Sequence, residues 1–155
     1  MEFHLRQIGV VRTDATDEEV RERSGNLSGR IEFFDEYAEA LEGIESYTHT
    51  FVIAYLNKVE RPLLKIKPRR LLRKGFREDQ LPEVGVLASD SPMRPNPIAL
   101  TLVRIVRREG NVLHVEGLDL FDGTPVIDIK PYRSDYRARE YKVPDWVNYE
   151  ARPDI

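Results

Sequence analysis

The feature that most constrains the fold is a stretch between residues 98 and 116 in which apolar residues alternate with other residues on both sides of Gly110. Alternation with a period of two is typical of β-strands, and a glycine between two such runs indicates a tight turn. We therefore expect an antiparallel hairpin formed by residues 98–107 and 111–116. Such a hairpin brings the loops before and after it close together.

A stiff loop precedes this hairpin. Residues 91–97 contain three prolines, each of which fixes its own φ and pushes the preceding residue toward extended geometry. The loop therefore holds Arg94 and Asn96 in place at little further cost in entropy. A loop stiffened in this way indicates a binding or catalytic site rather than a simple connection.

A second loop follows the hairpin. Asp122 and Gly123 form a turn signal, and residues 126–129 return as a short strand that Pro131 ends. Spacing alone also allows a pair of capped turns with a surface ion pair. We expect five side chains to lie close together at one end of a small sheet, which favours a functional site: Asp119, Asp122, Asp128, Lys130 and Tyr132.

The rest of the chain also favours strands. Residues 51–56 are continuously apolar, which predicts a core strand buried on both faces. Residues 16–23 predict a mobile loop, and two short helices are expected, one at 35–41 between a cap at Asp35 and a stop at Gly43, the other starting near Pro144. Further strands are expected at 3–12, 29–34, 47–56, 63–67 and 84–88. The fold class is therefore mostly β: a small β-barrel or strongly curled antiparallel sheet with one or two short helices.

Length and composition limit the possible classes of protein. The chain has 155 residues, of which 41% are hydrophobic, enough for one domain with a core and too few for two ordinary domains. It has no cysteine, and its three histidines lack metal-ligand spacing, so we expect no metal. No apolar run reaches membrane-spanning length, and no signal pattern starts the chain, so we expect a soluble, cytoplasmic protein.

Charge is distributed unevenly. The net charge is −3, yet residues 65–77 carry seven Lys and Arg residues. One interpretation is a solvent-exposed loop held by a few leucines, which is the usual structure of a run of charged residues. The other is contact with the phosphates of a nucleic acid, because a basic patch and not a basic protein is what such binding needs. The second interpretation concerns Arg69, Arg70, Arg73 and Lys74 in particular.

Two strings carry a resemblance to a known family. They are SPMRPNPIALTLVR at 91–104 and VEGLDLFDGTPVIDIKPY at 115–132, with further likeness at 8–11 and 43–49. They resemble the signature of the TsaA-like family of tRNA methyltransferases. The resemblance implies a β-barrel that binds S-adenosyl-L-methionine without a Rossmann fold, which agrees with the lack of any G-x-G-x-x-G after a strand. It also implies a homodimer whose cofactor pocket lies near the subunit boundary.

The resemblance further implies a substrate and a division of the chain. The substrate is tRNA, methylated on the exocyclic amine of threonylcarbamoyladenosine next to the anticodon. Residues 1–132 would form the cofactor-binding barrel, and residues 133–155 an extension that packs on the barrel or on the dimer partner. Two alternatives stay open: a methyltransferase of this fold for a different small substrate, and a non-catalytic module that binds an adenosyl ligand.

Roles follow for individual residues. On this reading the catalytic residues are Lys130, Tyr132, Asn96 and Asp128. Residues on the cofactor are Asn57, Lys58, Asp90, Leu100, Glu116, Gly117, Leu118 and Asp119. Substrate-binding residues are Arg94 and His49 together with the basic residues Arg69, Arg70, Arg73 and Lys74, although a lone histidine such as His49 is more often structural.

The chain departs from the family pattern at two places. Asp90 stands where family members commonly have an arginine, and the family's Pro-Arg-Gln element is replaced by residues 20–23. Arg21 and Arg23 are candidates for the contact with the cofactor that the missing element makes.

Overall fold

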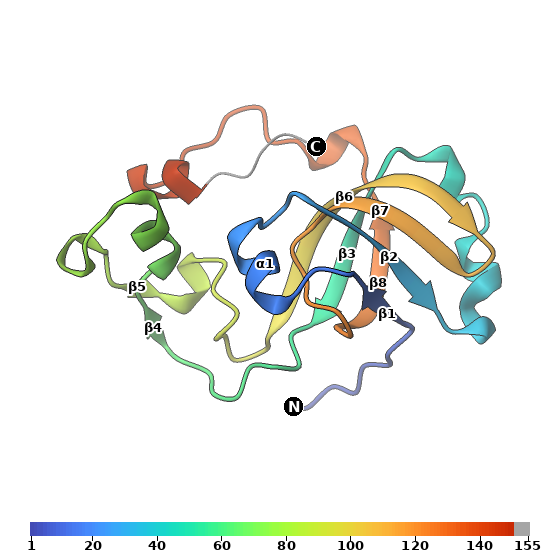
Figure 1. The fold of residues 1–155 in the computed structure, drawn as a ribbon, viewed down its shortest axis with the longest axis horizontal. Helices are drawn as coiled ribbons and strands as arrows, with labels where there is room; N and C mark the ends of the chain where they lie inside the picture. Colours follow the sequence, from blue (N-terminus) through green and yellow to red (C-terminus); the bar gives the residue numbers. More distant parts are fainter. Residues whose placement is uncertain (151–155) are drawn as a thin grey trace.

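The computed structural model describes residues 1–150, and its centre is a closed barrel of six antiparallel strands in the order β1-β2-β7-β6-β3-β8 (Figure 1). This confirms the mostly-β barrel expected from the sequence. The strands are β1 (Gly9–Arg12), β2 (Leu27–Phe33), β3 (His49–Tyr55), β6 (Ile98–Glu109), β7 (Val112–Leu118) and β8 (Pro125–Pro131).

The predicted hairpin is confirmed as β6 and β7. Gly110 has a φ of +61° at the turn, a conformation that L side chains rarely adopt. The register pairs Ile105 with Val115 and then shifts before Arg107, and such a bulge bends the strand. The turn at Gly123 and the strand ending at Pro131 are also confirmed.

The core lies inside the barrel, and each strand contributes alternate side chains to it. On β3, Thr50, Val52 and Ala54 are fully buried, whereas Phe51 and Ile53 between them are only half-buried. The prediction that this strand is buried on both faces is therefore wrong. A strand of a closed barrel buries only the side chains of its inner face in the barrel core. The core therefore does not explain why residues on the outer face of β3 are apolar.

The N-terminal segment differs from the sequence prediction in its length. The strand expected from residue 3 begins only at Gly9, where β1 pairs with β2 and β8, while Phe3 and Leu5 are exposed. At Gly9 a Cβ would lie 2.7 Å from the backbone oxygen of Glu32, so β1 and β2 approach each other too closely there for a side chain.

A short helix stands where a mobile loop was predicted. Helix α1 (Asp17–Glu22) is closed by a capping box in which Thr16 and Glu19 each satisfy the other's backbone amide, and Val20 anchors it in the core. The next helical segment, η1 (Asp35–Leu41), is a 3-10 helix followed by η2 (Ile44–Ser46). Asp35 is not its cap, because its carboxylate accepts a hydrogen bond from Asn111 at 3.0 Å.

An arm of short elements leaves the barrel between β3 and β6. It forms a two-stranded sheet from β4 (Lys65–Ile66) and β5 (Val84–Gly85), shorter than either predicted strand. Its other elements are the 3-10 helices η3 (Arg69–Lys74), η4 (Glu78–Gln80) and η5 (Val86–Ala88). The basic run is therefore a helical turn, anchored by the fully buried Leu71.

Two further 3-10 helices follow the barrel, η6 (Ser134–Tyr136) and η7 (Asp145–Glu150). Tyr136 packs on Phe51 of the barrel at 5.2 Å between ring centroids, and Tyr149 packs on Phe76 of the arm at 5.0 Å. Figure 1 shows η7 beside the arm. Residues 151–155 of the predicted extension lie outside the described residues, and the division of the chain at residue 132 stays a prediction.

Candidate functional site

A cavity of about 1090 Å³ opens at the end of the barrel where β3 and β7 finish and β6 begins. Four regions line it: the loop after β3, the proline-rich loop with the start of β6, the loop between β7 and β8, and a wall formed by α1 and η3. The two predicted loops therefore do meet around one hollow. Its floor is apolar, with Leu56, Ala99 and Leu120 among the lining residues.

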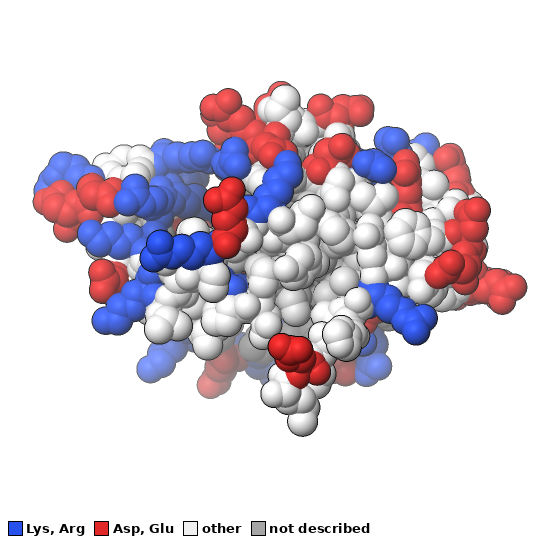
Figure 2. Space-filling view, turned by 90° about the horizontal axis from the view of Figure 1, so that it is seen from below, with Lys and Arg blue, Asp and Glu red and all other residues white. Residues whose placement is uncertain are grey.

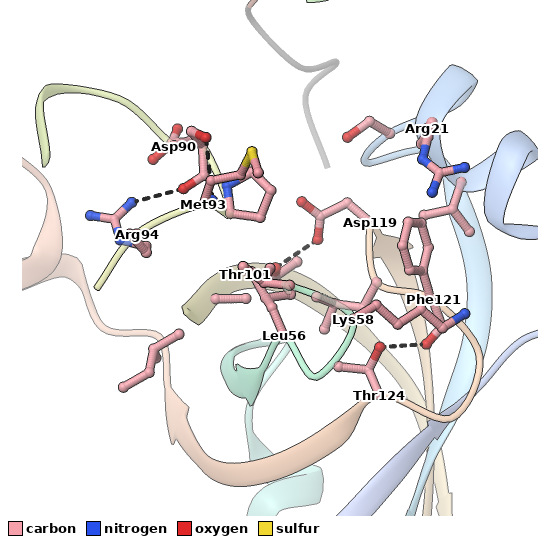
Figure 3. A pocket seen from close by; sticks show the side chains of 18 of the residues that line it. Arg21, Leu56, Lys58, Asp90, Met93, Arg94, Thr101, Asp119, Phe121 and Thr124 are labelled. Carbon is pink, nitrogen blue, oxygen red and sulfur yellow. Dashed lines mark hydrogen bonds between the residues drawn. The ribbon is translucent and has the colours of Figure 1, made fainter. Parts of the chain in front are cut away.

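Asp119 lies at the centre of this cavity, directly after β7. Its carboxylate accepts a hydrogen bond of 2.6 Å from the hydroxyl of Thr101, which is itself buried on β6 (Figure 3). The threonine fixes the direction of the carboxylate, because β6 and β7 are paired strands of the barrel. The result is an oriented negative charge above an apolar floor.

The proline-rich loop forms the opposite rim. Arg94 donates to the backbone oxygen of Ser89 at 3.0 Å and to that of Ser91 at 3.5 Å, so its guanidinium closes its own loop. Figure 3 shows the Arg94 side chain turned toward this loop. The loop is also tied to the arm, since the amide of Leu63 donates to the backbone oxygen of Met93 at 2.8 Å. Asn96 lines the cavity from the same loop.

The wall beside the arm is rich in arginine. Arg70 donates to the hydroxyl of Ser24 at 3.3 Å, and Arg73 donates to the backbone oxygen of Arg21 at 2.5 Å. Arg69 pairs with Glu78 at 3.1 Å. Part of the charge of the basic run is thus neutralised locally, as the interpretation of a solvent-exposed loop expects, but Arg69, Arg70 and Arg73 all line the cavity.

The charge of the cavity is opposite in sign to that of the chain. Six of the lining side chains are cationic and three are acidic, while the chain as a whole carries −3. Figure 2 shows Lys and Arg gathered on the side of the molecule where the arm lies, and few charges at the centre of that face. Such a cavity attracts a ligand that bears anionic groups.

Glu150 adds a carboxylate close to this wall. Burial raises the pKa of Glu150 above its ordinary value of 4.5; Asp90 raises it further, and Arg70 lowers it. The C-terminal 3-10 helix η7 therefore places an acidic group within the electrostatic reach of two cavity residues.

Ten of the eighteen predicted site residues line the cavity. They come from the loops after β3 and β7, the proline-rich loop with the start of β6, and η3, and they are Asn57, Lys58, Asp90, Arg94, Asn96, Leu100, Asp119, Arg69, Arg70 and Arg73. Their roles in binding or catalysis stay predictions. Arg21 lines the cavity as well.

Eight predicted residues do not line the cavity within one chain: Lys130, Tyr132, Asp128, His49, Glu116, Gly117, Leu118 and Lys74. Glu116 points to the barrel's outer surface and pairs with Arg104 at 2.6 Å, whereas Leu118 is fully buried in the core. Lys74 ends η3 on the exposed side.

The expectation that five side chains share one end of the sheet, namely Asp119, Asp122, Asp128, Lys130 and Tyr132, is wrong. Strand β8 starts beside the cavity and runs away from it, and the amide of Tyr132 bonds the backbone oxygen of His49 at the start of β3. There Tyr132 packs on Phe51 at 5.8 Å and on His49 at 6.4 Å between ring centroids. Lys130 pairs with Asp128 at 3.5 Å on the outer surface.

Thr101 and Phe121 are among the cavity residues that sequence reasoning missed. Thr101 is a polar residue at an inward position of β6, where Val103 and Ile105 are the next inward residues, and that pattern could have indicated it. Phe121 carried no local signal, because its importance comes from Arg21 and Lys58, which reach it from distant segments.

Residues 1–150 contain neither a candidate metal site nor a membrane-spanning helix. No group of three or more His, Cys, Asp and Glu side chains there could hold a metal ion. In the same part of the chain, every helix is too short or too polar to cross a membrane.

The sequence profile of a known family, the tRNA-methyltransferase O N-terminal domain, matches residues 19–137. The chain belongs to this family. The match includes both loops of the cavity and the basic turn η3, and it ends before the segment that leads to η7.

Relatives of this TrmO-family chain differ in length and in name. A probable S-adenosyl-L-methionine-binding protein of Methanothermobacter thermautotrophicus is 39% identical, with 87% of this chain and 93% of the relative covered. The tRNA (adenine(37)-N6)-methyltransferase of Rattus norvegicus is 31% identical over 81% of this chain, which spans 28% of that enzyme. The crystal structure of TrmO from Pseudomonas aeruginosa matches with a TM-score of 0.72 and 26% identity, covering 99% of this chain and 64% of the TrmO chain.

Proposed function

We propose that this chain is an S-adenosyl-L-methionine-dependent methyltransferase whose substrate is threonylcarbamoyladenosine next to the anticodon of tRNA. The observation that carries the proposal is the cavity, which combines an apolar floor, an oriented carboxylate and an excess of positive charge. Its volume of about 1090 Å³ lies at the upper end of the range for ligand pockets. It has room for a cofactor and for part of a second ligand.

The lining residues fit the proposed cofactor. Leu56, Ala99 and Leu100 offer an apolar surface to an adenine ring, and the Asp119 carboxylate suits ribose hydroxyls or an ammonium group. S-adenosyl-L-methionine supplies a methyl group on a sulfonium, whose positive charge is lost during transfer. Asp119 contributes by fixing the orientation of its ligand, because positioning dominates in such a transfer.

The accepting nitrogen needs help from the protein. The exocyclic nitrogen of threonylcarbamoyladenosine is conjugated with a carbonyl, so it attacks poorly until its proton is removed or shared. A side chain that accepts this proton, or a cation that polarises the carbonyl, would assist. Lys130 and Tyr132 are proposed for these roles, and Arg94 and Asn96 for shaping the pocket around the threonyl group.

Lys130 and Tyr132 can serve one cavity only if another subunit supplies them. The outer face of β3 and β6 carries three cross-strand apolar pairs, Phe51 with Leu102, Ile53 with Leu100 and Tyr55 with Ile98. Leu100 is 64% exposed and Tyr55 45% exposed, so this face is open to a partner. We define these six residues as the outer sheet face.

The outer sheet face joins the two predicted parts of the site. It runs from Phe51, which packs on Tyr132, to Tyr55 and Ile98 next to the cavity. A two-fold axis that lies in the interface and runs across the strands would reverse the strand direction of the second copy. The Tyr132 end of one subunit would then lie against the cavity of the other, which supports the proposed homodimer.

The proposed contact with the tRNA backbone rests on η3. Arg70 and Arg73 line the cavity and bond only uncharged oxygens in the contacts described here, of Ser24 and Arg21 respectively. Phosphate would be a stronger partner for a guanidinium than a hydroxyl or a carbonyl oxygen. Binding of tRNA should therefore depend on salt.

A second candidate function is a module that binds an adenosyl ligand and transfers no methyl group. A methyltransferase that acts on a different small substrate is the other alternative. The relative of Methanothermobacter, which this chain covers almost completely, is named for binding alone. Asp90 in the rim favours this candidate too, because it removes a cation from the position where the TsaA-like pattern has arginine.

One experiment with two parts tests the proposal. Calorimetry with S-adenosyl-L-methionine tests cofactor binding, and mass analysis of nucleosides from total tRNA tests for one added methyl group on threonylcarbamoyladenosine. Binding with methylation supports the proposal, and binding without methylation supports the second candidate. Absence of binding would exclude both.

A further inference from the structure

The ring of Phe121 holds two cationic groups from two other segments of the chain. The guanidinium carbon of Arg21 lies 4.9 Å from the ring centroid, and the ammonium nitrogen of Lys58 lies 5.0 Å from it. Figure 3 shows the ring between the two side chains. Both distances lie within the range of cation–π attraction. We define these three residues as the Phe121 stack.

The stack connects three regions of the cavity wall. Phe121 belongs to the loop between β7 and β8, Lys58 to the loop after β3, and Arg21 to helix α1. Lys58 also pairs with Asp17 of α1 at 2.5 Å. Asp17 and Arg21 are four residues apart on a helix, so they share one face and hold it toward the barrel.

Few contacts other than these keep helix α1 in its position against the barrel. It is six residues long, too short to be stable alone, and Val20 is the residue of this helix that is buried. Its position therefore depends on the Phe121 stack, on the ion pair with Lys58 and on the two arginines of η3 that bond Ser24 and the backbone of Arg21. Aliphatic packing at position 121 would not replace the attraction of the ring for two cations.

Two cations near one ring repel each other unless the environment compensates. The face of the phenyl ring offers each cation negative potential, and Asp17 neutralises Lys58 from the other side. Loss of the ring would leave Arg21 and Lys58 facing each other across the cavity wall. Arg21 would then move, and with it the backbone that Arg73 bonds.

We propose that Phe121 is a positioning residue that keeps α1 and Lys58 at the cavity wall through cation–π contacts, and thereby sets the affinity of the cavity for its adenosyl ligand. This inference rests on the proposed function for the identity of the ligand. The placement of α1 by the ring is independent of it. Phe121 acts through Arg21 and Lys58.

The test is a series of variants at position 121, with S-adenosyl-L-methionine as the probe in calorimetry. Phe121→Leu keeps an apolar side chain and removes the π face, and should weaken binding about tenfold. Phe121→Trp keeps the cation–π contact and should stay within about threefold of the wild type. Equal affinity in Phe121→Leu and wild type would overturn the proposal.

Amide hydrogen exchange of residues 17–22 provides a readout that needs no ligand. Phe121→Leu should speed exchange in α1 about tenfold, and Phe121→Trp should not. Phe76→Leu is the matched control, because Phe76 packs on Tyr149 and should leave exchange in α1 unchanged. If the wild type binds no S-adenosyl-L-methionine, the proposed function fails while the exchange data still decide the role of Phe121.

A second variant covers the case in which Phe121→Leu does not fold. Arg21→Met removes the cation and keeps the length of the side chain and the backbone bond from Arg73. It should weaken binding and loosen α1 in the same direction as Phe121→Leu, and the two changes together should cost no more than Phe121→Leu alone. Additive effects would show that Arg21 and Phe121 act independently, which contradicts the stack.

Discussion

The two ends of the barrel carry different kinds of side chains. The cavity end carries Asp119 on Thr101, a rim closed by Arg94 and a wall of arginines, with an excess of positive charge. The other end carries an aromatic cluster of His49, Tyr132, Phe51 and Tyr136, whose ring centroids lie 5.2–6.4 Å apart in the contacting pairs.

One chain therefore holds the proposed site in two separate parts. Five of the eight predicted cofactor residues line the cavity, whereas Lys130 and Tyr132 lie at the far end of β8. Seven residues of strand span roughly 20 Å, too far for a side chain to bridge. The outer sheet face lies between the two parts, so a second copy is the simplest way to join them.

The largest expected effect concerns the cavity end. Asp119→Asn should lower methyl transfer about 50-fold, because a charge-assisted hydrogen bond contributes about 1.5–3 kcal/mol to binding or catalysis. Calorimetry should show the loss in cofactor affinity. Asp135→Asn is the control, since that carboxylate pairs with Arg133 on the surface. An Asp119→Asn variant with wild-type affinity would remove this residue from the proposed cofactor site.

The next prediction tests whether the two ends meet between subunits. Tyr132→Phe and Asp119→Asn should each be nearly inactive alone. Mixed after subunit exchange, they should recover about a quarter of wild-type activity, because half of the dimers are mixed and one of their two sites is intact. No recovery, with mixed dimers confirmed by native mass spectrometry, would place both residues in the same subunit's site.

A matched variant examines the interface itself. Ile53→Asp places a charge at the centre of the outer sheet face and should convert the proposed dimer to a monomer, measured by analytical ultracentrifugation. Methyl transfer should fall with the dimer, while cofactor binding at the cavity should change less. Val106→Asp, on an exposed part of β6 outside this face, is the control. A dimer that survives Ile53→Asp uses another surface.

A smaller effect is expected at the arginine wall. Arg70→Gln and Arg73→Gln should each weaken tRNA binding a few-fold and lower the slope of log affinity against log salt by about one. Arg107→Gln, at the opposite end and paired with Glu109, should leave the slope unchanged. If the slopes of all three variants equal that of the wild type, η3 does not contact the phosphates.

The smallest effect concerns the contact of η7 with the arm. Burial raises the pKa of Glu150, so the docked segment favours its protonated form, and the stabilisation is lost as pH rises through that raised value. Fluorescence of Trp146, the one tryptophan of the chain, should therefore report tighter docking below pH 4.5 than at neutral pH. Glu150→Gln should abolish the pH dependence of the fluorescence, and Glu140→Gln, the control, should leave it unchanged. A transition that persists in Glu150→Gln would show that another group titrates.

Several parts of the fold could be predicted from the sequence because their causes are local. Alternation and Gly110 indicated β6 and β7, and the prolines of residues 91–97 indicated a rigid loop beside a site. Helix α1 was predicted as a loop because its segment is polar. Its capping box closes the N-terminal end, and Val20, the ion pair with Lys58 and the Phe121 stack hold it against the barrel.

Most strands, the turns and the family of this chain could be inferred from its residues alone, because periodicity, glycine, proline and motif strings act within a few residues of one another. The set of charged residues that share a cavity could not be inferred in this way, because the folded barrel brings them together. Asp119 and Tyr132 are close in sequence, yet a strand of β8's length separates them, whereas Arg21, Lys58 and Phe121 are far apart in sequence and meet on one ring. Strand direction and barrel closure set these distances, and both depend on contacts between segments far apart in the chain.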